Sequence, residues 1–186
     1  MLAYFLIFGV VVFDQLTKLL IRLYMEVGDS VPLIPGVINL TYIENDGAAF
    51  GMLDNARWVF MLVSAIAIVA IILFLRKHHI RHKLLTISLS FIAGGGIGNM
   101  IDRIFLTEVT DFFETQFVDF AVFNVADSFI TIGAILLGVY VIFFEPKVEK
   151  LIKQKEAEAK ADGENNESEN TLKDNGKNEN NCTDIQ

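Results

Sequence analysis

The sequence has one cysteine, Cys182, so it can form no disulfide within the chain and no metal site built from several thiols. Its three histidines, His78, His79 and His82, lie close together beside basic residues. We expect them to extend a basic loop rather than to bind a metal. No basic face suited to nucleic acid is present, so we expect no nucleic-acid partner.

Charge is scarce before the polar C-terminal part of the chain. The whole sequence is 53% hydrophobic, above the roughly 45–50% of soluble domains. Four apolar stretches stand out, at about 2–24, 58–75, 84–104 and 125–144. Each has close to the ~20 residues with which a helix crosses ~30 Å of hydrocarbon. Lipid gives the backbone no hydrogen-bond partners, so a spanning segment must be helical. The sequence therefore predicts an α-helical integral membrane protein with four transmembrane helices.

The first stretch lacks the basic n-region and the small-residue cleavage site of a secretory signal peptide. Asp14, Gln15 and Lys18 interrupt it, and apolar residues resume after them. We expect a retained, functional helix. Asp14 and Lys18 stand one helical turn apart and can neutralise each other. A purely structural ion pair explains them as well as a functional role does.

Basic residues are missing from two of the connecting segments. Residues 23–56 and 105–123 contain acidic residues and neither Lys nor Arg. The other two segments carry the following bases: Arg76, Lys77, Arg81 and Lys83, then Lys147, Lys150, Lys153 and Lys155. By the positive-inside rule, both termini and the middle loop are cytoplasmic, and the two acidic loops face outward.

The first outer loop has signals of β-structure. Val31-Pro-Leu-Ile-Pro-Gly predicts a turn region, and residues 37–43 predict a strand. We expect a small extracytoplasmic β-element. Residues 1–148 then form a four-helix membrane domain with outer loops at about 25–57 and 105–123, and residues 149–186 form a polar, disordered cytoplasmic tail.

The third apolar stretch combines small and polar residues. Gly94 and Gly98 make a small-xxx-small pattern, which lets helices approach closely. Asn99, Asp102 and Arg103 fall on one helix face near the outer surface. For these three we favour a structural Asp102–Arg103 pair at the helix end over catalysis.

Two further aspartates, Asp111 and Asp127, lie at the outer interface. Two carboxylates that converge on one water cannot both ionise, so one serves as acid while the other draws a proton from the water. Such a pair can hydrolyse an amide without metal, serine or cysteine. Spacing alone does not bring them together, and Glu114 and Asp119 are rival carboxylates. Asn124 is suited to cap the fourth helix.

Five motifs, in order over about 14–144, resemble the bacterial lipoprotein signal peptidase (signal peptidase II) family. They are Asp14-Gln-Leu-Thr-Lys18, Asn45-Asp-Gly47-Ala-Ala-Phe50-Gly51, Gly95-Gly-Ile-Gly-Asn99-Met-Ile-Asp102-Arg103, Asp111-Phe112 and Phe123-Asn124-Val-Ala-Asp127-Ser128. The resemblance implies that Asp111 and Asp127 are catalytic. It implies substrate-binding or supporting roles for Asp14, Lys18, Asn45, Gly47, Phe50, Asn99, Asp102, Arg103 and Asn124.

The resemblance also implies an activity. The protein would be an intramembrane aspartyl endopeptidase that removes signal peptides from diacylglyceryl-modified prolipoproteins, cleaving just before the lipidated cysteine with water activated by an aspartate dyad. It would need no metal and no other cofactor. Its partners would be those prolipoproteins, membrane lipids and a globomycin-type inhibitor. It would be a multi-pass protein of the bacterial cytoplasmic membrane, with its active site at the extracytoplasmic face.

Two other classes of protein remain open. A transporter or channel subunit would use Asp14, Lys18 and Asp102 as an ion relay, but it predicts more spanning helices or an internal repeat. A presenilin-type aspartyl protease would have a Gly-x-Gly-Asp motif, whereas here Gly98 is followed by Asn99.

Overall fold

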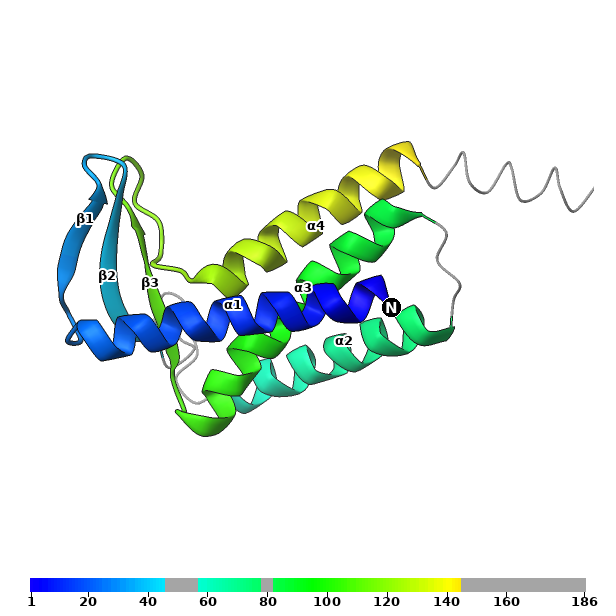
Figure 1. Cartoon of the computed structure of the whole chain (residues 1–186), viewed down its shortest axis with the longest axis horizontal. Coiled ribbons are helices and arrows are strands. Elements are labelled where there is room, and N and C mark those ends of the chain that lie inside the picture. The colour runs from blue at the N-terminus through cyan, green and yellow to red at the C-terminus, as the bar shows by residue number, and fades with distance from the viewer. Residues whose placement is uncertain (46–56, 78–81, 145–186) are drawn as a thin grey trace, which may run out of the picture. The chain divides into compact units, whose positions relative to one another are not determined.

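The computed structural model describes residues 1–45, 57–77 and 82–144. This part of the chain contains four helices and three strands (Figure 1). They are α1 (Leu2–Tyr24), β1 (Ser30–Ile34), β2 (Ile38–Asn45), α2 (Arg57–Lys77), α3 (Lys83–Phe105), β3 (Val109–Thr115) and α4 (Val125–Phe143). Residues 1–140 form one compact unit, and the packing described below belongs to it. Gly47, Phe50 and the predicted tail lie outside the described residues.

Helices are present at all four predicted positions, and that all four cross a membrane stays a prediction. Among the described residues, α1, α3 and α4 are long and apolar enough to cross a membrane. Large apolar side chains of α1 face outward, as in Phe5 and Phe8, which are 72% and 68% exposed. Its buried face carries the charged side chains Asp14 and Lys18, both 0% exposed, beside apolar residues such as Val10. Charged side chains on the inner face are expected of a helix in lipid, because polar side chains there must find partners inside the protein.

Glycines let α3 pack closely against each of the other helices. A Cβ atom added at Gly94 would lie 2.8 Å from Val10 Cβ of α1. One added at Gly95 would collide with the Ala126 carbonyl oxygen of α4, and Gly96 faces α2. The prediction that small residues in this stretch serve close packing is confirmed.

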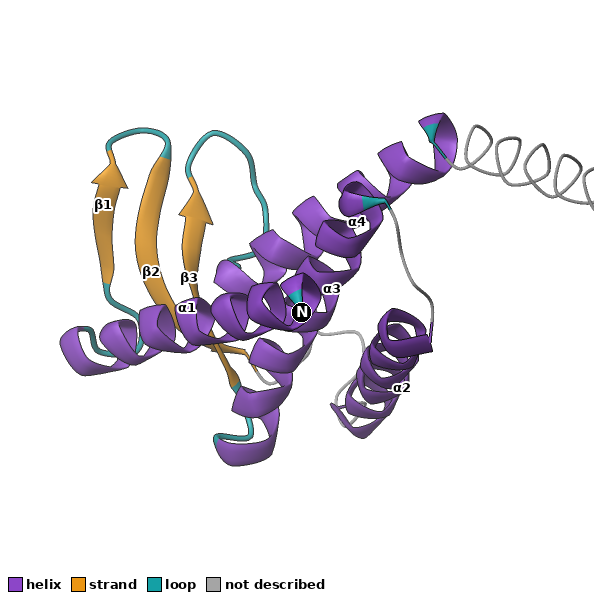
Figure 2. Ribbon diagram, turned by 45° about the vertical axis from the view of Figure 1, so that its right-hand side comes forward, coloured by secondary structure: helices purple, strands orange, loops and turns teal. Residues whose placement is uncertain are grey.

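The strands form one antiparallel sheet in the order β1-β2-β3 (Figure 2). The predicted strand at 37–43 is confirmed as β2. The predicted turn region is partly wrong, since residues 30–34 form β1 and the turn occupies only residues 35–37. Pairing with β2 stabilises β1, and the turn residues of this segment sit at its hairpin end.

Strand β3 was not predicted, and it carries Asp111. Leu40 of β2 pairs with Phe113, and Ile43 pairs with Asp111, so β2 contains an extra residue between these pairs. Such a bulge bends a strand and redirects its side chains.

A small apolar cluster joins the sheet to the helices beside Asp111. It contains Ile21, Tyr42, Phe112 and Val125, from α1, β2, β3 and α4 respectively. Because Phe112 directly follows Asp111, this cluster fixes the neighbour of that aspartate against two helices.

Candidate functional site

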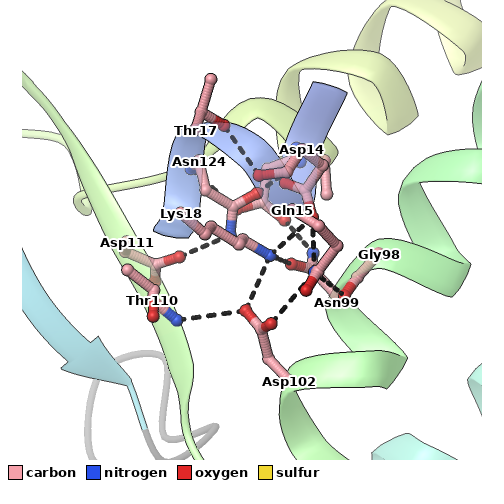
Figure 3. A network of polar contacts seen from close by, with 12 residues as sticks. Asp14, Gln15, Thr17, Lys18, Gly98, Asn99, Asp102, Thr110, Asp111 and Asn124 are labelled. Carbon is pink, nitrogen blue, oxygen red and sulfur yellow. Dashed lines mark hydrogen bonds and ion pairs between the residues drawn. The ribbon is translucent and has the colours of Figure 1, made fainter. Parts of the chain in front are cut away.

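Lys18 lies at the centre of a buried polar network (Figure 3). Its Nζ is 3.0 Å from Asp14 Oδ2 and 2.9 Å from Asp102 Oδ2. It also donates a hydrogen bond to Asn99 Oδ1 at 2.8 Å. An ammonium group has three N–H donors, and here each has an acceptor. The predicted ion pair between Asp14 and Lys18 is confirmed.

The predicted pair between Asp102 and Arg103 is wrong. Asp102 is fully buried and binds Lys18 of α1 instead. Gln15 donates a second hydrogen bond to it, from Nε2 to Asp102 Oδ1 at 3.0 Å. Neighbouring residues on a helix point in different directions. Asp102 therefore faces α1, and no ion pair joins Arg103 to another residue within the described ranges.

Asp14 ties α1 to both α3 and α4. A Cβ atom added at Gly98 would lie 2.5 Å from Asp14 Oδ2, so glycine is required for the carboxylate to approach α3. The other oxygen, Asp14 Oδ1, accepts a hydrogen bond from the Ala126 N–H at 2.9 Å. That N–H is one of those that the first turn of α4 cannot bond internally.

The start of α4 fixes the orientation of Asp127. Asn124 Oδ1 accepts a hydrogen bond from the Asp127 N–H at 3.0 Å, and Asp127 Oδ2 accepts one from the Asn124 N–H at 3.2 Å. These reciprocal bonds form a capping box, and the predicted Asn124 cap is confirmed. Asp127 Oδ1 accepts a third bond, from Asn99 Nδ2 at 2.7 Å. Both carboxylate oxygens are thus held.

Asn124 also holds the second aspartate. Its Nδ2 donates to Asp111 Oδ1 at 2.6 Å and to Asn99 Oδ1 at 3.0 Å. Asn45, at the end of β2, donates from Nδ2 to Asp111 Oδ2 at 2.8 Å. One fully buried asparagine therefore bonds both aspartates, and the fold brings Asp111 and Asp127 to the same site.

Asp111 is only 3% exposed. Burial, the largest cause, and the negative charge of Asp127 raise the pKa of its carboxyl group to about 6. Hydrogen bonds from Asn45 and Asn124 and the charge of Lys18 act in the opposite direction. A carboxyl group with this pKa can hold or release a proton close to neutral pH.

The rival carboxylates lie elsewhere in the described part of the chain. Glu114 accepts a hydrogen bond from Thr41 Oγ1 at 2.6 Å, on the sheet. No hydrogen bond or ion pair there joins Glu114 or Asp119 to Asp127. Also within the described residues, no group of three or more His, Cys, Asp or Glu side chains is arranged to hold a metal ion. That the activity needs no metal stays a prediction.

Sequence reasoning did not identify Arg22, Gln15 and Thr110 as site residues. Arg22 Nη1 donates to Thr110 Oγ1 at 2.9 Å and lies 3.9 Å from Asp102 Oδ1. The sequence did contain a signal for Arg22, because it follows Lys18 by four residues just as Lys18 follows Asp14. Asp14, Lys18 and Arg22 therefore fall on one face of a helix.

Comparisons with known proteins identify relatives of this chain. A family model described as signal peptidase (SPase) II matches residues 6–143. A protein of Geobacillus kaustophilus named lipoprotein signal peptidase is 42% identical, and the match covers 76% of this chain and 93% of that protein. A protein of Symbiobacterium thermophilum with the same name is 43% identical over 79% of this chain and 98% of its own length.

Solved structures with the same fold are also membrane enzymes. Two structures, each described as a bacterial membrane enzyme determined by the in meso method, match with TM-scores of 0.71 and 0.70. They are 35% and 36% identical, covering 76% and 75% of this chain and 93% and 87% of theirs. These matches favour a peptidase over a transporter or channel subunit. With the family model covering most of its length, the chain belongs to the signal peptidase II family.

Proposed function

We propose that this protein is an intramembrane aspartyl endopeptidase that removes signal peptides from diacylglyceryl-modified prolipoproteins, cleaving just before the lipidated cysteine. Membership of the signal peptidase II family supports the reaction, and the relatives named lipoprotein signal peptidase support the substrate class. One observation carries the catalytic assignment. The buried side chain of Asn124 bonds Asp111 and the N–H of Asp127 at once, so two carboxyl groups share one site.

The two aspartates differ in a way that suits opposite roles. Asp127 accepts N–H hydrogen bonds on both oxygens and lies in the first turn of α4, where the helix dipole favours an anion. Asp111 is buried, and its pKa, raised to about 6, leaves far more of the protonated form near neutral pH than an ordinary aspartate has. Asp127 is therefore the base and Asp111 the acid.

Hydrolysis then proceeds by two proton transfers. Asp127 takes a proton from water as the water oxygen attacks the peptide carbonyl carbon, and Asp111 gives its proton to the carbonyl oxygen. In the resulting diol, Asp127 returns its proton to the leaving nitrogen as the C–N bond breaks. Asp111 recovers a proton from a diol hydroxyl as the carboxylic acid product forms. The dyad ends in the protonation state in which it began.

The residues around the dyad hold it in this arrangement. An ammonium group can only donate hydrogen bonds, so the Oδ1 atom of Asn99 faces Lys18. The Nδ2 atom of Asn99 therefore faces Asp127. Asp14 and Asp102 neutralise Lys18 and join α1 to the other elements. Asn45 orients Asp111 and contacts the substrate backbone. Arg103, Gly47 and Phe50 complete the substrate site, as their match to the family motifs indicates.

The proposal includes a topology. Four helices cross the bacterial cytoplasmic membrane, both termini are cytoplasmic, and the dyad lies at the outer face. The distribution of Lys and Arg between the connecting segments supports this orientation. A cysteine that carries diacylglycerol stays at the bilayer surface, and Asp127 in the first turn of an apolar helix lies at the corresponding depth.

Cleavage of a diacylglyceryl-modified prolipoprotein by the purified protein in lipid nanodiscs tests the proposal. Asp111→Asn and Asp127→Asn should each abolish turnover, whereas Asp119→Asn, in the segment between them, should retain it. The same peptide without diacylglycerol should not be cleaved, and globomycin should inhibit. Near-normal turnover by either dyad variant would refute the assignment.

A further inference from the structure

Arg22 extends the charged face of α1 by one more turn. Asp14, Lys18 and Arg22 follow each other at intervals of four residues and share one side of the helix. The side chain of Arg22 is 24% exposed, whereas Asp14, Lys18 and Asp102 are 0% exposed. Arg22 therefore lies where the buried network approaches the surface.

Lys18 alone cannot neutralise its two carboxylates. When all three are ionised, Asp14, Lys18 and Asp102 carry one net negative charge away from water, and an unbalanced buried charge is costly. The guanidinium of Arg22, 3.9 Å from Asp102 Oδ1, brings the sum to zero. The pairing holds the Asp102 carboxylate in place.

Arg22 and Asp102 together hold Thr110 at two points. Arg22 Nη1 donates to Thr110 Oγ1 at 2.9 Å. The Thr110 N–H donates to Asp102 Oδ2 at 3.4 Å (Figure 3). Thr110 is 2% exposed and directly precedes Asp111. The chain enters β3 through Thr107, whose φ of 73° is in the left-handed region that non-glycine residues rarely adopt. The first residues of β3 thus follow a strained turn and need anchoring.

We propose that Arg22 is a positioning residue for the peptidase reaction, which fixes the start of β3, and with it the Asp111 carboxyl group, by holding Thr110 and Asp102. The inference rests on the proposed function. Asp111 makes its hydrogen bonds to Asn124 and Asn45 at 2.6 and 2.8 Å. A shift of ~1 Å in β3 would break them, and displacement of a catalytic group by ~1 Å can cost about 100-fold in rate.

Three variants test this role in the nanodisc cleavage assay, with kcat normalised to the folded protein recovered by size-exclusion chromatography. Arg22→Met keeps the length of the side chain and removes its charge and donors. It should lower kcat by about 10- to 100-fold and change KM by less than about twofold. Arg22→Lys, which keeps the charge, should recover part of the loss. Arg76→Met, the same change at an exposed arginine of α2, should behave as the unaltered enzyme.

Thr110→Val tests the contact without changing any charge. It should also lower kcat, and the double variant with Arg22→Met should be no slower than Arg22→Met alone, because both remove one interaction. Normal kcat in Thr110→Val, additive losses, or a change confined to KM would each overturn the inference, even if Arg22→Met failed to fold. Asp111→Asn in the same assay separates the two proposals. If it still turned over, the proposed function would be wrong. If it were inactive while Arg22→Met was normal, only the role of Arg22 would be wrong.

Discussion

Replacing Asp111 with asparagine should stabilise the folded protein at neutral pH while it abolishes the proposed activity. The pKa of this carboxyl group rises from 3.8 to about 6 on folding, chiefly because the group is buried. The folded state therefore binds the proton more tightly than the unfolded state. Stability falls as the pH rises from about 3.8 to about 6 and stays lower above that range. The ionised carboxylate is a cost to the fold.

The magnitude follows from the pKa difference. About 2 pKa units at ~1.4 kcal/mol each correspond to a penalty of ~3 kcal/mol at pH 7. Asparagine avoids it, but Asp111 accepts from the Nδ2 groups of Asn124 and Asn45, so a new NH₂ group would face one of these donors. Losing that hydrogen bond costs ~1–2 kcal/mol. The net gain should be ~1–2 kcal/mol, or an increase in Tm of about 2–8 °C for a protein of this size.

Thermal unfolding of both proteins in the same detergent, at pH values from 4 to 8, measures this gain. The two Tm values should nearly coincide at pH 4, where Asp111 is protonated, and separate as the pH passes about 6. Asp119→Asn, at an exposed carboxylate, should show no such pH-dependent gain. A Tm difference that is the same at pH 4 and pH 8 would show that burial does not hold the proton on Asp111.

Other predictions concern the network and the catalytic type. Lys18→Met leaves Asp14 and Asp102 buried without their shared cation, so it should destabilise the fold by ~3–5 kcal/mol; an unchanged Tm would contradict this. Gly98→Ala should lower both Tm and kcat, because its Cβ would lie 2.5 Å from Asp14 Oδ2, whereas Gly9→Ala, with nothing within 4 Å, should change neither. Chelator-treated enzyme should keep full activity, and a loss that zinc restored would indicate a metallopeptidase.

The helices were predictable because an apolar stretch that crosses lipid must form a helix. Stretches at about 2–24 and 84–104 became Leu2–Tyr24 and Lys83–Phe105. Strand β3 was not predictable in the same way. Residues 109–115 pair with β2, which precedes them by about 70 residues, and no local pattern specifies such a pairing. The bulge in β2, which sets Ile43 opposite Asp111, likewise depends on that pairing.

The partners of the buried polar residues were likewise predictable only where the contact is local in the sequence. The bond between Asp14 and Lys18 was predictable, because i,i+4 geometry on a helix is local. The partner of Asp102 was wrongly assigned to its neighbour Arg103, whereas the true partner, Lys18, lies on another helix. That Asp111 and Asp127 meet did not follow from their spacing. It depends on Asn124, whose side chain donates a hydrogen bond to Asp111 and accepts one from the N–H of Asp127.

The position of the proposed dyad follows from how this protein satisfies its polar groups. Side chains such as Lys18 have no partners in lipid, so they gather between the helices, where glycines of α3 bring the backbones close. Lys18 has an acceptor for each of its donors, and Arg22 balances the charge that Lys18 leaves on its two carboxylates. Asp111 lies at its edge, on a strand, and has amide donors but no cation as a direct partner among the described residues. The network therefore stabilises the helices at its centre, while the carboxyl group at its edge keeps the raised pKa that the proposed role of Asp111 as general acid would use.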